Sequence, residues 1–204
     1  MMKTRGFLLA AALAAMVFTL SCSSDDEGGG GGSSCNADFG AVTIGTQVWA
    51  AKNLNCDAGV STCYGNNPAN CDKYGRLYNR ETSLTICPKG WHLPSEAEWN
   101  VLINYAGGST AAGTKLKATN GWNDYEGESG NGTDDYGFSA LPGGQCPYST
   151  GAACYGVGTQ ALWWTATKGG TLDGSDARAM FSSNTGVVGS GVSIYFYSVR
   201  CVKN

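Results

Sequence analysis

The sequence predicts an α+β domain, and three observations lead to that class. Residues 41–44 and 47–50 flank a Gly-Thr turn in the manner of a β-hairpin. A capped amphipathic helix follows at residues 96–105. Strand-like apolar runs come last, at residues 163–167, 177–182 and 194–203. Because hairpin, helices and strands form separate blocks along the chain, we expect α+β with a sheet that is completed late.

The helix at residues 96–105 has clear boundaries. Ser95 is an N-cap, Glu98 stands at the third helical position to complete a capping box, and a Gly-Gly pair ends the helix. One broad face is predicted to be buried, formed by Ala97, Trp99, Val101, Leu102 and Ile103. A shorter helix is expected over residues 110–118, and the Gly-, Asn- and Asp-rich residues 120–139 predict long loops.

The N-terminus is predicted to be a targeting segment. Residues 1–21 combine a basic start with a short apolar run, which is typical of a secretory signal. The run ends in Thr-Leu-Ser-Cys and resembles a bacterial lipobox, so Cys22 is expected to carry acyl chains that anchor the protein in a membrane. The alternative is an ordinary signal peptide in which Cys22 is incidental.

Residues 22–34 predict a flexible tether ahead of a folded part at residues 35–204. The tether holds an acidic cluster and a Gly/Ser run. The acidic cluster resembles the surface-export signal of lipoproteins in Bacteroidetes-type bacteria, which implies an outer-membrane protein facing the outside. A solvated acidic tail is the other interpretation.

Net charge argues against a nucleic-acid-binding protein, and the cysteine count indicates the compartment. Cleavage before Cys22 removes Lys3 and Arg5, so 11 basic residues stand against 16 acidic ones, a net charge of −5. No basic face is therefore expected for nucleic acid. The sequence has 9 cysteines, and 8 remain for pairing when Cys22 is acylated, an even number suited to an oxidising compartment.

Six ordered motifs carry a family resemblance. They are Gly45–Asn55, Cys71–Tyr78, Cys87–Trp99, Asp135–Gly144, Trp163–Thr167 and Ser198–Val202. Together they resemble the Fibrobacter succinogenes major paralogous domain, from about residue 41 to residue 203. The segment 93–99 and the ending 199–202 are also similar to formylglycine-generating enzymes. That likeness implies a C-type-lectin-like fold, with two helices, a small antiparallel sheet and long disulfide-stapled loops.

Sequence alone leaves 105 ways to pair the eight cysteines. Cys63 with Cys71 and Cys146 with Cys154 each bracket a short loop, as local staples do. The lectin-like resemblance implies a long-range bridge between Cys87 and Cys201, and Cys35 with Cys56 is the pair left over. A zinc site is the alternative, but no CxxC spacing is present and His92 is the single histidine.

No catalytic constellation is expected. Formylglycine-generating enzymes use reactive cysteines or cysteine-bound copper near the chain end, whereas here the only cysteine in that region is Cys201, which already has a structural partner in the lectin-like pattern. His92 is expected to pack and hydrogen-bond. Glu96 and Glu98 lie two apart on a helix and so on different faces.

An acidic loop and a set of aromatic residues are the candidate binding features. The loop carboxylates are predicted either to hold calcium or to be solvated: Asp124, Glu126, Glu128, Asp134 and Asp135. The aromatic rings are predicted either to stack on sugars or to anchor loops by burial: Trp122, Tyr125, Tyr136, Tyr148, Tyr155, Trp163 and Trp164.

The leading hypothesis is a non-enzymatic, lipid-anchored surface protein for adhesion or glycan binding. Its expected partners are the membrane, through the anchor, and a polysaccharide or another surface protein. A formylglycine-generating-like oxidoreductase and a structural surface protein without a small ligand are the alternatives.

Overall fold

The computed structural model describes residue 1 and residues 38–148, 153–168, 177–190 and 194–204. The chain divides into two units, residues 1–31 and 32–204, and every described helix and strand lies in the second. Apart from Met1, the signal segment, Cys22, the tether and Cys35 lie outside the described residues, so what was expected of them stays a prediction. Among the described residues, no helix has the length and apolar character needed to cross a membrane.

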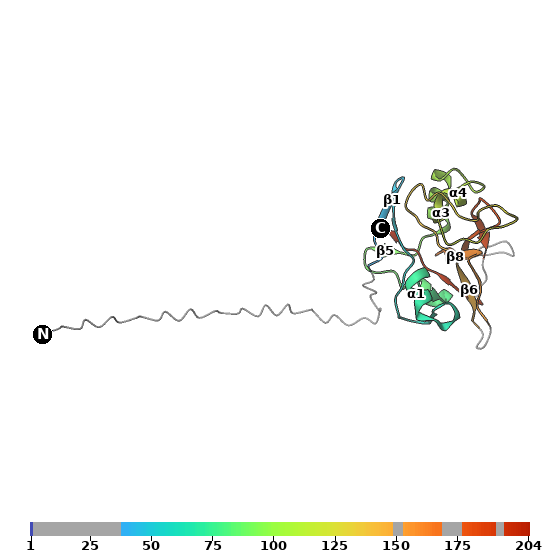
Figure 1. The fold of residues 1–204 in the computed structure, drawn as a ribbon. Coiled ribbons are helices and arrows are strands. Elements are labelled where there is room, and N and C mark those ends of the chain that lie inside the picture. Colours follow the sequence, from blue (N-terminus) through green and yellow to red (C-terminus); the bar gives the residue numbers. More distant parts are fainter. Residues whose placement is uncertain (2–37, 149–152, 169–176, 191–193) are drawn as a thin grey trace. The chain divides into compact units, whose positions relative to one another are not determined.

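A four-stranded sheet contains the predicted hairpin. Its strands are β1 (Ala41–Ile44), β2 (Gln47–Ala50), β5 (Trp91–His92) and β12 (Val202–Lys203), in the order β1-β2-β12-β5. The hairpin has the predicted bounds, with Val42 opposite Trp49. β12 lies between β2 and β5, so in Figure 1 the C-terminal end of the chain lies beside strands from early in the sequence.

An eight-stranded mixed sheet forms the rest of the β-structure. Its strands are β3 (Ser61–Thr62), β4 (Leu77–Tyr78), β6 (Gly143–Pro147), β7 (Tyr155–Val157), β8 (Gln160–Trp164), β9 (Ala177–Phe181), β10 (Val188–Ser190) and β11 (Tyr195–Ser198). The order is β10-β9-β8-β6-β11-β4-β3, with β7 paired to β6. The α+β class is confirmed, but the expectation of a small sheet is wrong. Strands of two or three residues are too short to show a hydrophobic period in the sequence, so the sheet is larger than expected.

The helices are short except for one. They are the 3-10 helix η1 (Tyr64–Asn66), α1 (Pro68–Tyr74), α2 (Arg80–Ser83), α3 (Glu96–Tyr105) and α4 (Ala112–Leu116). The two expected helices are α3 and α4, while α1 and α2 were missed, so the two-helix detail is wrong. In Figure 1, α3 and α4 lie toward the top of the view and α1 lies below them.

The capping box predicted for α3 is confirmed, with Ser95 and Glu98 bonding reciprocally. Its buried face is narrower than predicted, because Ala97 and Val101 are exposed. The residues that pack are Trp99, Leu102 and Ile103, so helical spacing located the helix but overestimated the width of its apolar stripe.

The core is divided by β8, which is buried on both faces. Ala161 and Trp163 belong to one hydrophobic cluster, and Leu162 and Trp164 belong to another. Successive side chains of a strand point to opposite faces, so this single strand serves both clusters. The ring centroids of Trp99 and Trp163 lie 5.9 Å apart in the first cluster.

The predicted strand at residues 194–203 is in fact two strands, β11 and β12, which belong to different sheets. Between them, the carbonyls of Val199 and Cys201 accept hydrogen bonds from the backbone amides of Leu54 and Ala50. The chain therefore crosses from one sheet to the other at residues 199–201, held by the segment that follows β2. Arg200 lies at the centre of this crossover.

Candidate binding cavity

A cavity of about 540 Å³ opens at the crossover. This volume falls in the usual range of small-ligand sites, roughly 300–1,000 Å³. Its lining comes from four stretches that are distant in sequence: residues 38–55, 71–75, 137–141 and Arg200. The lining combines apolar side chains (Phe39, Tyr74 and Leu141) with polar and charged ones (Asp38, Lys52, Asn53, Asp72, Lys73 and Ser139).

Arg200 is the buried charge of the cavity, with 1% of its surface exposed. Its Nε donates to Oδ1 of Asn53 at 2.9 Å, and its Nη1 donates to the carbonyls of Ala50 at 3.2 Å and Phe138 at 2.6 Å. The guanidinium carbon lies 4.5 Å from the centroid of the Phe138 ring. Among the described residues, Nη2 has no acceptor and no carboxylate forms an ion pair with Arg200.

Burial has an electrostatic consequence for this guanidinium. Loss of solvent lowers the pKa of Arg200 to about 9, and the negative charge of Asp134 acts in the opposite direction. The side chain therefore remains a cation at neutral pH. Its charge is stabilised by neutral carbonyl and amide oxygens rather than by a bonded carboxylate.

Asn53 fixes the position of this arginine. Its Oδ1 accepts from Nε of Arg200 and from the indole Nε1 of Trp163 at 2.8 Å. Its Nδ2 donates to the carbonyl of Tyr74 at 2.8 Å and to Oγ of Ser198 at 3.3 Å. Each polar atom of the buried amide is engaged, so it joins β8, α1 and β11 behind the cavity.

The backbone around the cavity adopts uncommon conformations. Asp134 and Ser139 both have φ of 49°, and the Asp134 carboxylate accepts hydrogen bonds from the Ser139 amide at 2.7 Å and from its hydroxyl at 2.5 Å. Gly75 has φ of 81°, and a Cβ there would lie 2.6 Å from Cβ of Asn53. Residues held at positive φ often mark functional sites.

The aromatic residues predicted to stack on sugars do not form one site. Trp122, Trp163 and Trp164 are at most 4% exposed, and their indole N–H groups donate to Ala140, Asn53 and Tyr78. They are core residues, so burial, the other of the two predicted roles, is confirmed for these three, and stacking on sugars is wrong for them because a closed ring face cannot meet a ligand. Tyr136 is half-buried against Tyr105, while Tyr125 is exposed and distant from the cavity lining.

Tyr148 and Tyr155 are exposed as well, and they lie on opposite faces of a β-ribbon. Tyr148 stacks on Phe196 with centroids 5.3 Å apart, and Tyr155 meets Tyr195 edge to face at 6.0 Å. Phe196 and Tyr195 are consecutive on β11, so their side chains diverge. The two exposed tyrosines therefore do not share a binding surface.

The predicted calcium ligands are not brought together. Among the described residues, no group of three or more His, Cys, Asp or Glu side chains could hold a metal ion. Asp124, Glu126, Glu128 and Asp135 are exposed. Asp134 is instead engaged with Ser139, so the acidic loop is solvated except at this one position.

Three predicted disulfides are present: Cys63–Cys71, Cys87–Cys201 and Cys146–Cys154. Cys56 is also disulfide-bonded. Cys35, its predicted partner, lies outside the described residues, so that pairing stays a prediction. Every cysteine of the described residues is thus in a disulfide, which excludes a zinc thiolate site among them.

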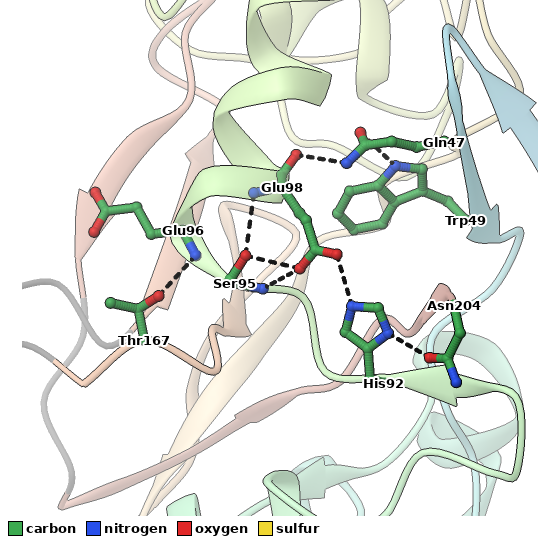
Figure 2. A network of polar contacts seen from close by, with 8 residues as sticks. All are labelled: Gln47, Trp49, His92, Ser95, Glu96, Glu98, Thr167 and Asn204. Carbon is green, nitrogen blue, oxygen red and sulfur yellow. Dashed lines mark hydrogen bonds and ion pairs between the residues drawn. The ribbon is translucent and has the colours of Figure 1, made fainter.

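His92 belongs to a separate polar network, which Figure 2 shows. Its Nε2 lies 2.7 Å from Oε1 of Glu98, and its Nδ1 lies 2.7 Å from Oδ1 of Asn204. Burial lowers the pKa of His92, but the hydrogen bonds to Asn204 and Glu98, with the charge of Glu98, outweigh burial and raise it overall. The Glu98 carboxylate also accepts from the amide and hydroxyl of Ser95, so the capping box is part of this network.

Sequence reasoning missed the cavity and its two central residues, Asn53 and Arg200. One signal was available, because Arg200 is a charged residue between Val199 and Cys201 in a run otherwise read as an apolar strand. Such a residue requires either a partner or a ligand. Its side-chain partner Asn53 lies 147 positions earlier in the chain, and no local pattern indicates a contact of that separation.

Comparison with known proteins gives one match. The model of the Fibrobacter succinogenes major domain matches residues 42–203, which is most of the chain. No curated protein and no solved structure matches it. The cavity lining residues Asn53, Lys73, Ser139 and Arg200 fall within four of the six motifs that carry the family resemblance.

Proposed function

Because this chain belongs to the Fibrobacter succinogenes major domain family, we propose that it is a lipid-anchored surface protein that binds glycans in the Arg200 cavity. The protein acts in adhesion, holding a polysaccharide or the glycan of another surface protein. It carries out no catalytic step. The single observation behind the proposal is the cavity itself, a concave site that combines apolar side chains with polar and charged ones.

The lining suits a sugar ring. Sugars present apolar faces edged with hydroxyl groups, and the side chains of Phe39, Tyr74 and Leu141 supply apolar contact. Asp38 and Asp72 are hydroxyl acceptors, whereas Lys52 and Lys73 are donors. Most of these polar groups are exposed at the rim and remain free to meet a ligand.

Two observations support a non-enzymatic role. The Cys87–Cys201 disulfide occupies the cysteine that an oxidoreductase of the formylglycine-generating type would use near the chain end. His92 has both ring nitrogens engaged by Glu98 and Asn204, and Ser95 Oγ donates to Glu98 rather than to the histidine. The network lacks the nucleophile–base contact of nucleophilic catalysis.

We also propose that the domain is C-type-lectin-like. The supporting features are the bridge from the segment before α3 to the last strands and the return of β12 beside β2 and β5. An experimental structure that shares no topology with lectin-like domains would contradict this.

The binding proposal is tested on the mature chain carrying Cys22→Ala, which keeps the protein in solution. We expect it to bind at least one class of polysaccharide on a glycan array and by calorimetry. Asp72→Ala with Lys73→Ala should weaken that binding at least tenfold while leaving the melting temperature within a few degrees. Tyr125→Ala is the matched control, because Tyr125 is exposed but lies outside the cavity lining. Failure of the unmutated domain to bind any glycan would favour the structural role instead.

The anchor is tested separately in cells. If Cys22 is acylated, Cys22→Ala should move the protein from the membrane fraction to the soluble fraction, because the acyl chains supply the affinity. Unchanged membrane partitioning would contradict the lipoprotein proposal. Accessibility to external protease in intact cells tests whether the domain faces outward.

A further inference from the structure

We propose that the cavity recognises a sugar residue bearing a carboxylate, that is a uronic acid, and that Arg200 determines this specificity. The inference rests on the proposed function, since it names the class of glycan that the same cavity binds. It is carried by the hydrogen-bond pattern of Arg200 and by the charges around it.

The protein forms hydrogen bonds with only part of the Arg200 guanidinium. Of its five N–H groups, one on Nε and two on Nη1 are directed at Asn53, Ala50 and Phe138. The two N–H groups of Nη2 have no acceptor among the described residues. Because Arg200 lines the cavity and its other nitrogens face the protein, Nη2 is the end presented to a ligand.

The charge around the cavity matches one negative charge. The lining contains three cations (Lys52, Lys73 and Arg200) and two carboxylates (Asp38 and Asp72), which leaves one net positive charge. Asp134 also acts on Arg200, where its negative charge raises the pKa, but its carboxylate is held by Ser139 and does not line the cavity. A carboxylate fits this surplus, whereas a phosphate dianion exceeds it.

Burial strengthens the attraction between the positive charge of Arg200 and an anionic ligand. Lys52 and Lys73 are solvated, but Arg200 is shielded from water, so a carboxylate at Nη2 would form a charge-assisted hydrogen bond. The guanidinium is already fixed by Asn53 and by the Phe138 ring, so little ordering cost accompanies binding. Neutral sugars would leave the two N–H groups without an anionic partner.

The test compares trigalacturonic acid with its fully methyl-esterified form, because the two differ only at the carboxyl groups, which are charged in the acid and neutral in the ester. Calorimetry uses the mature chain carrying Cys22→Ala. We expect the acid to bind at least tenfold more tightly than the ester at low salt, and Arg200→Gln to remove the difference. A sulfated trisaccharide of galactose is the third ligand; each sulfate carries one negative charge, so it separates a preference for carboxylate from a preference for any monoanion.

Each outcome has a distinct meaning. Equal affinity for acid and ester overturns the inference but leaves glycan binding intact, and tighter binding of the sulfated sugar overturns the choice of carboxylate. Binding of none of the three, together with an empty glycan array, overturns the proposed function as well. If Arg200→Gln fails to fold, Arg200→Lys serves in its place, because it keeps a positive charge but removes the Nη2 donors. That variant should also lose the preference for the acid, and a preference as large as that of the unmutated protein would contradict the role of Arg200.

Discussion

The Arg200 cavity and the His92 network are both polar clusters that include residues from the last seven of the chain. They differ in which hydrogen-bonding groups are left without a partner. At His92 the charges are paired within the protein, since Glu98 accepts from both His92 and Ser95. At Arg200 the charge is buried and, among the residues that the structure describes, is bonded only to neutral oxygens, with Nη2 left without an acceptor.

This difference separates a structural cluster from the cavity that we propose as a binding site. A half-exposed network whose polar atoms bond one another stabilises an element, here the start of α3 and its contact with the C-terminal residues (Figure 2). A buried charge with free donors is costly unless something occupies the adjoining space. His92 forms hydrogen bonds within the protein, as the sequence predicts, whereas Arg200 was not singled out from the sequence.

The largest effect on the free energy of unfolding is expected from removing the Cys87–Cys201 disulfide, which fixes the C-terminal residues that contribute to both clusters. Replacing Cys87 and Cys201 by serine opens a separation of 114 residues, and the chain-entropy model gives a loss of about 5 kcal/mol in unfolding free energy. The matched variant lacks Cys146–Cys154, a separation of 8 residues, and should lose about 2.5 kcal/mol. Urea denaturation measures both, and equal losses would show that loop length is not the cause.

Asn53→Leu should be the next most damaging change and should affect only the cavity side. It leaves the Arg200 and Trp163 N–H groups without their acceptor in a buried setting, at a cost of about 3 kcal/mol. The control is Asn55→Leu, because Asn55 is exposed although it also lines the cavity. A loss below 1 kcal/mol for Asn53→Leu would mean that Arg200 finds other acceptors.

The His92 network should give a smaller, pH-dependent effect. The pKa of His92 is raised, so its contribution to stability is complete below its unfolded value, about 6.5, and is lost as pH rises through the folded value. Hydrogen bonds from Ser95 and His92 lower the pKa of Glu98 against the opposing effect of burial, so its contribution is lost only in strong acid. The melting temperature of the unmutated protein should therefore exceed that of His92→Gln most near pH 5.5 and least near pH 9. An exposed pair of this kind contributes less than about 1 kcal/mol, and a constant difference across pH would contradict the charge pairing.

The smallest effect is expected at Tyr125, one of the residues predicted to stack on sugars. Its side chain is 47% exposed in the acidic loop and lies outside the cavity lining. Tyr125→Ala should change the unfolding free energy by less than about 0.5 kcal/mol and leave glycan affinity unchanged. A loss of affinity would place the binding surface in the loop rather than at Arg200.

The sequence was sufficient to predict those elements whose signals come from residues close together in the chain. The hairpin around Gly45, the capping box of Ser95 and Glu98, and the loops of residues 120–139 depend on turn and cap residues that are neighbours in the chain. The short strands β3, β4 and β5 were not predicted, because two residues cannot show a hydrophobic period. The long-range bridge between Cys87 and Cys201 was implied by the lectin-like resemblance and not by any local pattern, and the structure confirms it.

The sequence by itself therefore determined the α+β class, the main helix and the family, and its local spacing indicated two of the disulfides. Only the tertiary structure decided which aromatic residues are closed to solvent and where a cavity lies. The physical reason is that burial and hydrogen-bond satisfaction are set by partners distant in the chain. Trp122 belongs to a polar loop by sequence but is buried in the fold, and Arg200 meets Asn53 across 147 positions.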